Sequence, residues 1–266
     1  CIGCDMGFHR LAINGMDIGS DQPIINDNII LICNGEIYNY HELYNLFPKG
    51  TAKTNSDCEI IVHMYRKFGI DYTLNNLDGE FAFCLLDLEK NNIYISRDPY
   101  GVRPMYTLAS TYKTEIKEEI NFYSFTSEMK QLVPLNNKII STLKSNQKKP
   151  TIEQFKPGTY SKFYLSDQYW VLEKNEKYST KGFLISDLVY DNNLLTEIKF
   201  KLIESVKKRI IGSTDRPVAC LLSGGLDSSL ITSIVSKYVK NLETYSIGLK
   251  DSEDLRYAKI VADSLG

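Results

Sequence analysis

The stretch Leu221-Leu222-Ser223-Gly224-Gly225-Leu226-Asp227-Ser228-Ser229 decides the fold of the C-terminal part of the chain. Its first two residues are the last two of the apolar run 217–222, and such a run is typical of a strand buried in a parallel sheet. The two glycines permit a sharp turn, and apolar residues of 227–238 then recur with the period of a helix. The stretch therefore predicts a strand, a tight loop and a helix.

A loop of this kind is suited to hold phosphate groups. A helix N-terminus presents free N–H donors and a partial positive charge, and Ser223, Ser228 and Ser229 would add hydroxyl donors. Asp227 would repel bare phosphate, so its presence indicates a bridging Mg²⁺. The alternative is an ordinary Gly-Gly turn in which Asp and Ser only cap the helix.

Two further elements follow the loop. Residues 243–249 read as the next strand and residues 254–265 as another amphipathic helix. This alternation predicts an α/β domain whose parallel sheet binds ligands at the carboxyl ends of its strands.

Composition excludes several classes of protein. The net charge of −2 gives no electrostatic reason to expect nucleic acid as a partner. No apolar run approaches the roughly 18 residues that span a bilayer, so we expect no membrane association and a cytoplasmic location. In a reducing compartment the six cysteines would be buried free thiols.

The N-terminal part has a different pattern, of short apolar strands separated by turns. One helix is expected at 56–68, with Ser56 to Glu59 as a capping box and Gly69 as its end. The strands indicate a mostly antiparallel architecture, and we expect them at 8–13, 29–33, 81–88, 93–97, 105–108 and 122–126.

A polar stretch at 174–182 is interpreted as a linker between two domains. The predicted division is 1–173, 174–182 and 183–266. After the linker, a helix is expected over 194–211, because apolar residues share one face and Gly212 follows as a stop.

Several polar residues of the N-terminal part form a second candidate site. Taken singly, Asn34-Gly35 is a hairpin turn, Arg10 a solvated or paired charge, and Asp57 a helix-start carboxylate. In combination, an Asn amide and a Gly N–H form an oxyanion hole, Arg binds a carboxylate, and an acid binds an ammonium group. Such a set is complementary to free glutamine.

The motifs G-F-H-R-L-A, N-G-E-I-Y-N, S-D-C-E, L-D-G-x-F-A-F and R-D-P-Y-G-V-R-P resemble the class II glutamine amidotransferase domain. The S-G-G-L-D-S loop resembles that of the N-type ATP pyrophosphatases. Together they resemble the family of glutamine-hydrolysing asparagine synthetases. The resemblance implies an α+β N-terminal-nucleophile αββα sandwich, N-terminally truncated, followed by the start of an α/β parallel-sheet nucleotide-binding domain.

The resemblance also implies residue roles. Arg10 would bind the glutamine carboxylate, Glu36 and Asp57 its amino group, and Asn34 with Gly35 the oxyanion. Leu11 and Ile13 would complete the glutamine site. Asp227 would ligate Mg²⁺. The ATP site would comprise Leu221, Ser223, Gly224, Gly225, Asp227, Ser228, Ile247 and Gly248.

The implied activity is that of a carbon–nitrogen ligase of asparagine biosynthesis. A cysteine thiolate would attack glutamine and release ammonia. ATP would adenylate aspartate to β-aspartyl-AMP, which ammonia would convert to asparagine. Glutamine, aspartate and ATP are the expected partners, Mg²⁺ is the expected metal, and a homodimer is allowed.

Two departures from the family pattern lead us to expect a fragment. The family begins Cys-Gly-Ile well before the H-R-L segment, whereas Cys1 stands close to Arg10, so we expect the nucleophile to be missing. The later S-G-E-G-x-D-E loop would lie beyond Gly266. The alternatives are a related carboxylate-adenylating amide synthetase with an inactive glutaminase half, and a non-catalytic nucleotide-binding fragment.

Overall fold

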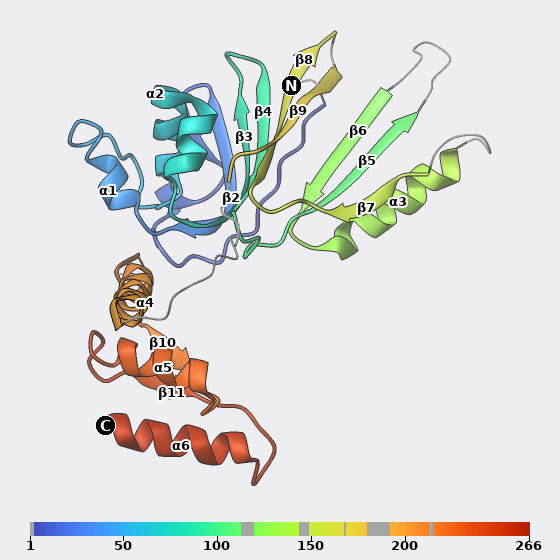
Figure 1. Cartoon of the computed structure of the whole chain (residues 1–266). Helices are drawn as coiled ribbons and strands as arrows, with labels where there is room; N and C mark the ends of the chain where they lie inside the picture. Colours follow the sequence, from blue (N-terminus) through green and yellow to red (C-terminus); the bar gives the residue numbers. More distant parts are fainter. Residues whose placement is uncertain (1–2, 113–119, 144–148, 168, 180–191, 213–214) are drawn as a thin grey trace. The chain divides into compact units, whose positions relative to one another are not determined.

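The computed structural model describes residues 3–112, 120–143, 149–167, 169–179, 192–212 and 215–266. The chain divides into two compact units, coloured along the sequence in Figure 1. Unit 1 comprises Cys1–Leu11 and Asp17–Phe183, and unit 2 comprises Ala12–Met16 and Leu184–Gly266.

Unit 1 is built on a six-stranded antiparallel sheet with the order β1-β2-β3-β4-β8-β9. Its long central strands alternate apolar residues toward both faces, which is the pattern of a sheet covered on two sides. The strands are β1 (Ile24–Asn26), β2 (Ile29–Ile37), β3 (Gly79–Asp87), β4 (Asn92–Arg97), β8 (Thr159–Ser166) and β9 (Tyr169–Lys177).

Helices cover one face of this sheet. α2 (Glu59–Asn76) packs against it and α1 (Tyr40–Tyr44) lies beside α2 (Figure 1). Alternate residues of β3, namely Phe81, Phe83 and Leu85, join the same core as Ile60, Ile61 and Met64 of α2.

The opposite face meets a second antiparallel sheet with the order β6-β5-β7. The intervening β3 residues Ala82 and Leu86 share a core with Met105 and Phe155, and α3 packs on the far side of the second sheet. The order helix, sheet, sheet, helix agrees with the expected αββα sandwich. The bounds are β5 (Tyr106–Tyr112), β6 (Ile120–Thr126), α3 (Met129–Thr142) and β7 (Thr151–Gln154).

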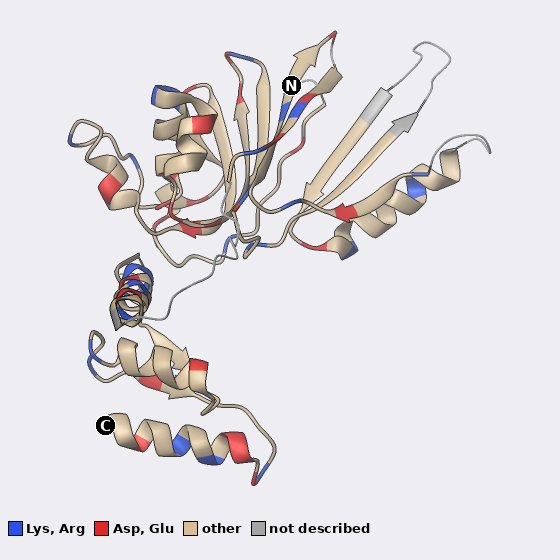
Figure 2. Cartoon of the chain, in the orientation of Figure 1, with Lys and Arg blue, Asp and Glu red and all other residues tan. Residues whose placement is uncertain are grey.

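Unit 2 contains a parallel pair of strands joined through a helix, as the alternation of its sequence predicts. Its core includes Val206, Cys220, Ile234 and Val235. Acidic and basic side chains are interspersed along α4 and α6 (Figure 2). The elements are α4 (Asn192–Gly212), β10 (Ala219–Leu221), α5 (Leu226–Val235), β11 (Glu243–Tyr245) and α6 (Glu253–Leu265).

Three predictions about the elements need correction. Residues 8–13 form no strand. The capping box at Ser56 is absent, because the Glu59 carboxylate bonds instead to the N–H groups of Lys53 and Thr54. The predicted linker begins too early, since residues 174–177 pair with β8 as the end of β9.

Gly69 was expected to end the helix that begins near Ser56, and it does so only in part. Its φ of 81° and ψ of 173° interrupt α2, but helical structure resumes and continues to Asn76. Among the described residues, no helix is both long enough and apolar enough to cross a bilayer.

Candidate functional site

The outer edge of β2 forms the centre of the first candidate site. At this edge Cys33 N–H donates to Gln22 Oε1 at 2.6 Å, and Ile37 N–H donates to Asp57 Oδ2 at 2.7 Å. Gln22 Nε2 also donates to the Cys33 carbonyl at 2.9 Å. A side chain from before β1 and one from before α2 therefore accept hydrogen bonds from two outward N–H groups of the strand, at positions 33 and 37.

Gly35 stands between these two satisfied positions. Tyr38 N–H donates to Asp78 O at 2.8 Å, immediately beyond the last ladder pair of β2 and β3. Because bonded and non-bonded pairs alternate in an antiparallel ladder, the Gly35–Phe81 pair is non-bonded. The Gly35 N–H therefore points to the outer edge, where no acceptor is found among the described residues.

The hairpin-turn interpretation of Asn34-Gly35 is wrong. Asn34 pairs with Ala82 and Gly35 with Phe81 in the middle of the β2–β3 ladder. A Cβ on Gly35 would lie 2.1 Å from the Glu80 carbonyl oxygen. Close approach of the neighbouring strand, rather than a turn, accounts for the glycine.

Asn34 and Glu36 project to one face of β2, opposite to the face shared by Cys33 and Gly35. Glu36 pairs directly with Glu80, and like charges at such positions repel. Arg103 bonds Glu80 at 2.7 Å and offsets that repulsion.

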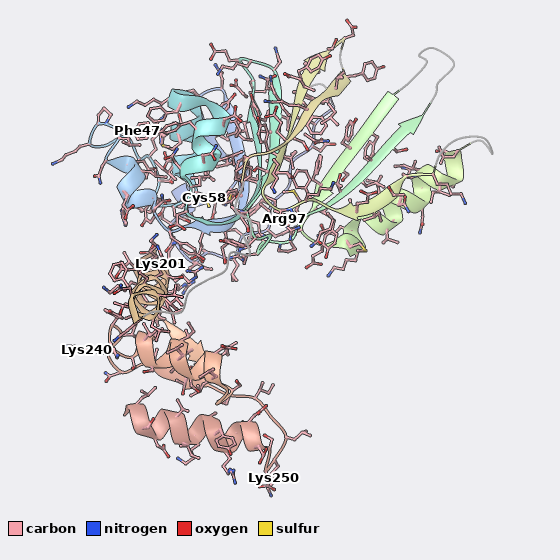
Figure 3. All side chains as sticks on the ribbon, viewed as in Figure 1. Phe47, Cys58, Arg97, Lys201, Lys240 and Lys250 are labelled. Atoms are coloured by element: carbon pink, nitrogen blue, oxygen red, sulfur yellow. The ribbon has the colours of Figure 1, made fainter. Side chains whose placement is uncertain are left out.

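Cys33 and Cys58 lie in the core between β2 and α2. Cys58, labelled in Figure 3, stands at the start of α2. Its Sγ lies 3.6 Å from the Gly35 carbonyl oxygen, and the residue is 2% exposed. Its hydrogen bond with Cys33, together with burial, raises the pKa of the Cys58 thiol well above its usual value. Cys58 is therefore a protonated core residue and not a nucleophile.

Arg10 is held near the start of unit 1 by Asp21, with Nη1 3.0 Å from Oδ1. Its side chain is 13% exposed. The other residues predicted beside it are placed differently, since Leu11 is 86% exposed and Ile13 belongs to unit 2. Cys1, which we do not expect to be the nucleophile, lies outside the described residues.

The second candidate site is in unit 2, at the carboxyl ends of its parallel strands. Leu222 N–H donates to Tyr245 O at 2.9 Å, and Ser246 Oγ donates to Leu222 O at 2.6 Å. These bonds bring Leu221 at the end of β10 close to the segment that carries Ile247. Both side chains are largely exposed, at 84% and 98%.

Two serine hydroxyl groups of the segment between β10 and α5 form hydrogen bonds within that segment. Ser223 Oγ and Ser228 Oγ lie 3.0 Å apart, and Ser228 Oγ donates to the Gly225 carbonyl at 3.2 Å. No side chain caps the N-terminus of α5, and Ser229 Oγ is buried without a partner among the described residues. Asp227 is exposed in the first turn. This donor set fits a phosphate group.

Two glycines let this loop and the next approach α6. A Cβ on Gly224, whose φ is 79°, would lie 2.5 Å from the backbone nitrogen of Ala258. A Cβ on Gly248 would lie 2.7 Å from Ser252 Oγ. The backbone of α6 therefore requires a glycine at position 224, whereas at position 248 the side chains of Ser252 and Leu255 would have to move.

Sequence reasoning did not identify Gln22 or Glu59 as parts of the first site. Gln22 acts across eleven residues and has no local motif that would reveal its pairing with Cys33. The sequence around Glu59 predicts a capping box, and its true partners appear only in the folded chain.

The glutamine amidotransferase domain family matches residues 3–166, and the asparagine synthase family matches residues 197–266. Asparagine synthetase [glutamine-hydrolyzing] of Homo sapiens is 36% identical over 99% of this chain and 47% of its own length. The Gallus gallus protein of the same name is 33% identical over the same shares. The chain thus spans about half the length of these curated relatives.

Among solved structures, the chain is similar to the glutamine phosphoribosylpyrophosphate amidotransferase from B. subtilis complexed with ADP and GMP. The TM-score is 0.42 and the identity 17%, over 90% of this chain and 53% of that one.

Proposed function

Because the chain belongs to the glutamine amidotransferase domain family, we propose that unit 1 binds free glutamine and supplies its amide nitrogen for asparagine synthesis. The chain is also asparagine synthetase-like, since the start of an asparagine synthase domain follows unit 1 in the sequence. In this proposal unit 2 contributes the first part of an ATP site at which aspartate is activated. The complete reaction belongs to a protein that contains the rest of the synthetase domain.

The outward Gly35 N–H is the observation that carries the proposal. The other outward N–H groups, of Cys33 and Ile37, donate to side chains of residues far away in the sequence. The Gly35 N–H is left as a donor at this edge of the strand. A preorganised N–H of this kind stabilises the oxyanion that forms when an amide is attacked. The Asn34 side-chain amide would supply the second donor.

The charged residues are suited to the two ends of the amino acid. Arg10 carries a guanidinium that would bind the α-carboxylate in the bidentate manner typical of Arg. Asp57 and Glu36 would bind the α-ammonium. Asp57 is positioned for this role by its bond to Ile37 N–H, at 2.7 Å.

In a protein that carries the nucleophile, a cysteine thiolate would attack the carbonyl carbon of the glutamine side-chain amide, the C–N bond would break, and ammonia would leave with a proton while a glutamyl thioester remains. Arg10 and Asp57 orient the substrate, and the donors of β2 stabilise the negative oxygen. Water then regenerates the thiolate and yields glutamate.

The residues of the second site fit ATP. The uncapped N-terminus of α5 and the Ser223 and Ser228 hydroxyls would hold its phosphates, and Leu221 with Ile247 would contact the base. Asp227 would hold Mg²⁺, which neutralises phosphate charge when bound.

Calorimetric titration of the 266-residue chain with L-glutamine tests the proposal. Replacement of Arg10 by Lys should weaken binding about tenfold or more, because the bidentate carboxylate contact is lost. Arg66→Lys is the matched control, since Arg66 also pairs with an aspartate, Asp27, at 3.2 Å. Equal affinities of both variants and the wild type, or an absence of glutamine binding, would refute the glutamine site.

The ATP site is tested separately by titration with Mg-ATP. Asp227→Asn should weaken binding, whereas Asp263→Asn should not, because Asp263 is exposed near the end of α6, where it pairs with Lys259. Equal binding by both variants would remove Asp227 from the site.

A further inference from the structure

The carboxylate of Glu59 is one of the most deeply buried charged groups in unit 1. Glu59 is 1% exposed and begins α2, two residues after Asp57. Despite its burial, hydrogen bonds from His63, Lys53 and Thr54 hold its pKa below the usual value, so it is ionised. A buried ionised carboxylate requires hydrogen-bond donors nearby. The donors of Glu59 therefore show which part of the chain it holds in place.

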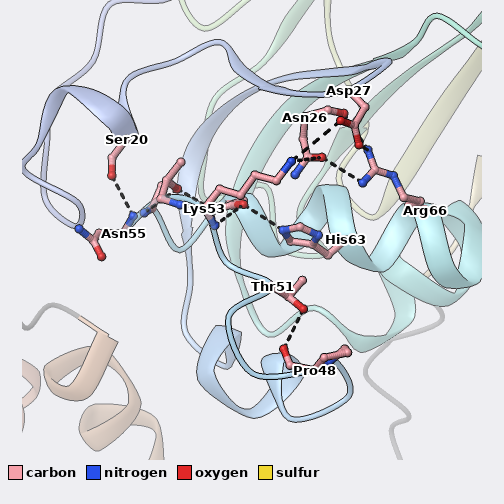
Figure 4. Close-up of polar contacts among 12 residues, drawn as sticks. Ser20, Asn26, Asp27, Pro48, Thr51, Lys53, Asn55, His63 and Arg66 are labelled. Atoms are coloured by element: carbon pink, nitrogen blue, oxygen red, sulfur yellow. Dashed lines mark hydrogen bonds and ion pairs between the residues drawn. The ribbon is translucent and has the colours of Figure 1, made fainter.

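Those donors belong mainly to the segment that leads to Asp57. Thr54 gives both its N–H and its Oγ1 to Glu59 Oε2 at 2.7 Å, and Lys53 N–H donates to Oε1 at 3.0 Å. Thr54 Oγ1 in turn accepts from Ser56 N–H at 3.1 Å. Figure 4 shows Lys53 beside this network.

The other side of the segment is held by the turn at residues 17–20. Asn55 N–H donates to Ser20 Oγ at 3.0 Å (Figure 4). Asn55 Nδ2 donates to Asp17 Oδ2 at 2.9 Å. Ser20 Oγ also donates to Asp17 at 3.0 Å. Residues 53–56 are therefore bonded on both sides immediately before Asp57.

His63 holds Glu59 from within the helix. Its Nε2 lies 2.9 Å from Glu59 Oε1, one helical turn away, and it is 6% exposed. The centroid of its ring lies 5.9 Å from that of Tyr44 and 5.9 Å from that of Phe47. Because an ionised carboxylate only accepts, Nε2 is assigned as the donor.

We infer that Glu59, held by His63, is a positioning residue that places the Asp57 carboxylate for the α-ammonium of an amino-acid substrate. Glu59 binds the backbone before Asp57, and Asp57 binds Ile37 N–H at the end of β2. The bonds of Glu59 thus set where Asp57 stands relative to Gly35. This inference rests on the proposed glutamine site.

The experiment compares two ligands that differ only at the ammonium group. L-Glutamine and glutaramate, which lacks the α-amino group, are titrated into the 266-residue chain by NMR. Glu59→Gln should raise the Kd for glutamine about tenfold, as expected for lost bonds to a charged group, and leave the Kd for glutaramate within about twofold. Glu89→Gln, an exposed carboxylate at the β3–β4 turn, should change neither.

His63 variants keep the inference testable if Glu59→Gln fails to fold. His63→Gln retains an N–H donor toward Glu59 and should bind glutamine within about threefold of the wild type, whereas His63→Ala should weaken it about tenfold. Recovery in His63→Gln supports the inference. Equal binding by the two His63 variants refutes it.

Three other results would each contradict the inference, and they identify different causes. If Glu59→Gln weakens both ligands equally, Glu59 acts through general stability and the positioning role is wrong. If Glu59→Gln binds glutamine like the wild type, the role is also wrong. If the wild type does not prefer glutamine to glutaramate, the proposed ammonium site at Asp57 fails, and the inference fails with it.

Discussion

At the scale of single residues, the first site depends on one backbone donor and the absence of one side chain. Gly35 lies within β2, and its N–H is directed away from β3. Any Cβ at this position would overlap the Glu80 carbonyl oxygen and crowd the Phe81 Cα at 2.7 Å. The same position thus serves both the packing of the sheet and the proposed oxyanion hole.

Gly35→Ala should destabilise unit 1 by about 1–3 kcal/mol or more, because backbone of the neighbouring strand must move. Denaturant unfolding followed by the fluorescence of Trp170, which lies on β9, measures this change. Gly7→Ala is the control, since a Cβ there meets nothing within 4 Å. Similar unfolding midpoints for both variants would contradict the close approach seen at Gly35.

Asn34→Ala should lower glutamine-dependent asparagine synthesis by about 10²-fold in a protein that carries both activities, because one oxyanion donor is lost. Synthesis from free ammonia should be unchanged. Assays of the two nitrogen sources decide the matter. An equal loss with both sources would show that Asn34 has only a structural role in the sheet.

At the scale of elements, each site lies where one element ends against another. The loop from β10 to α5 packs directly against the backbone of α6, and this close contact requires a glycine at position 224. The start of α2 is ordered by Glu59, which bonds to residues before the helix. Both contacts lead to testable differences.

Gly224→Ala should weaken Mg-ATP binding at least tenfold, because a φ of 79° and contact with Ala258 both oppose a side chain. Gly225→Ala should have a smaller effect, since its Cβ would meet only Ser223 Oγ at 3.5 Å. Calorimetric titration of both variants with Mg-ATP measures the difference. A larger loss in Gly225→Ala would contradict the packing argument.

Glu59 should make the stability of unit 1 depend on pH. Its folded-state pKa lies below the usual 4.5, so its stabilising contribution is fully present above that value and is lost as pH falls through the folded-state pKa. Glu59→Gln should therefore show a shallower loss of stability on acidification below about pH 4.5. Unfolding followed by Trp170 fluorescence at a series of pH values provides the measurement, and parallel profiles would contradict the assignment.

At the scale of the whole molecule, the chain has separate cores in its two units. Phe81, Ile60 and their neighbours form one of them, and Val206 and Ile234 belong to another. The residues proposed to bind glutamine belong to unit 1, and those proposed to bind ATP belong to unit 2. Ligands that bind only a folded unit stabilise that unit by mass action.

Glutamine at about 100 times its Kd should therefore stabilise the transition reported by Trp170 by about 2.7 kcal/mol, whereas Mg-ATP should leave that transition unchanged. Trp170 is suited to this test because it is the single tryptophan and lies in unit 1. A shift of the Trp170 transition by Mg-ATP would show that the two units do not unfold independently.

The sequence alone determined the elements whose signal is local. The apolar run before Ser223, the Gly-Gly turn and the helical period after it predicted the order of β10 and α5, because each depends on neighbours in the chain. The αββα order of unit 1 followed from the motifs that resemble a known family, and not from periodicity.

Only the tertiary structure decided the roles that depend on distant partners. Asn34-Gly35 has the local signature of a turn, yet pairing with β3 keeps it in a strand. Glu59 has the signature of a capping box, yet its carboxylate bonds to Lys53 and Thr54. Local propensity is worth less free energy than a sheet ladder or the donors required by a buried charge, so long-range contacts decide these positions.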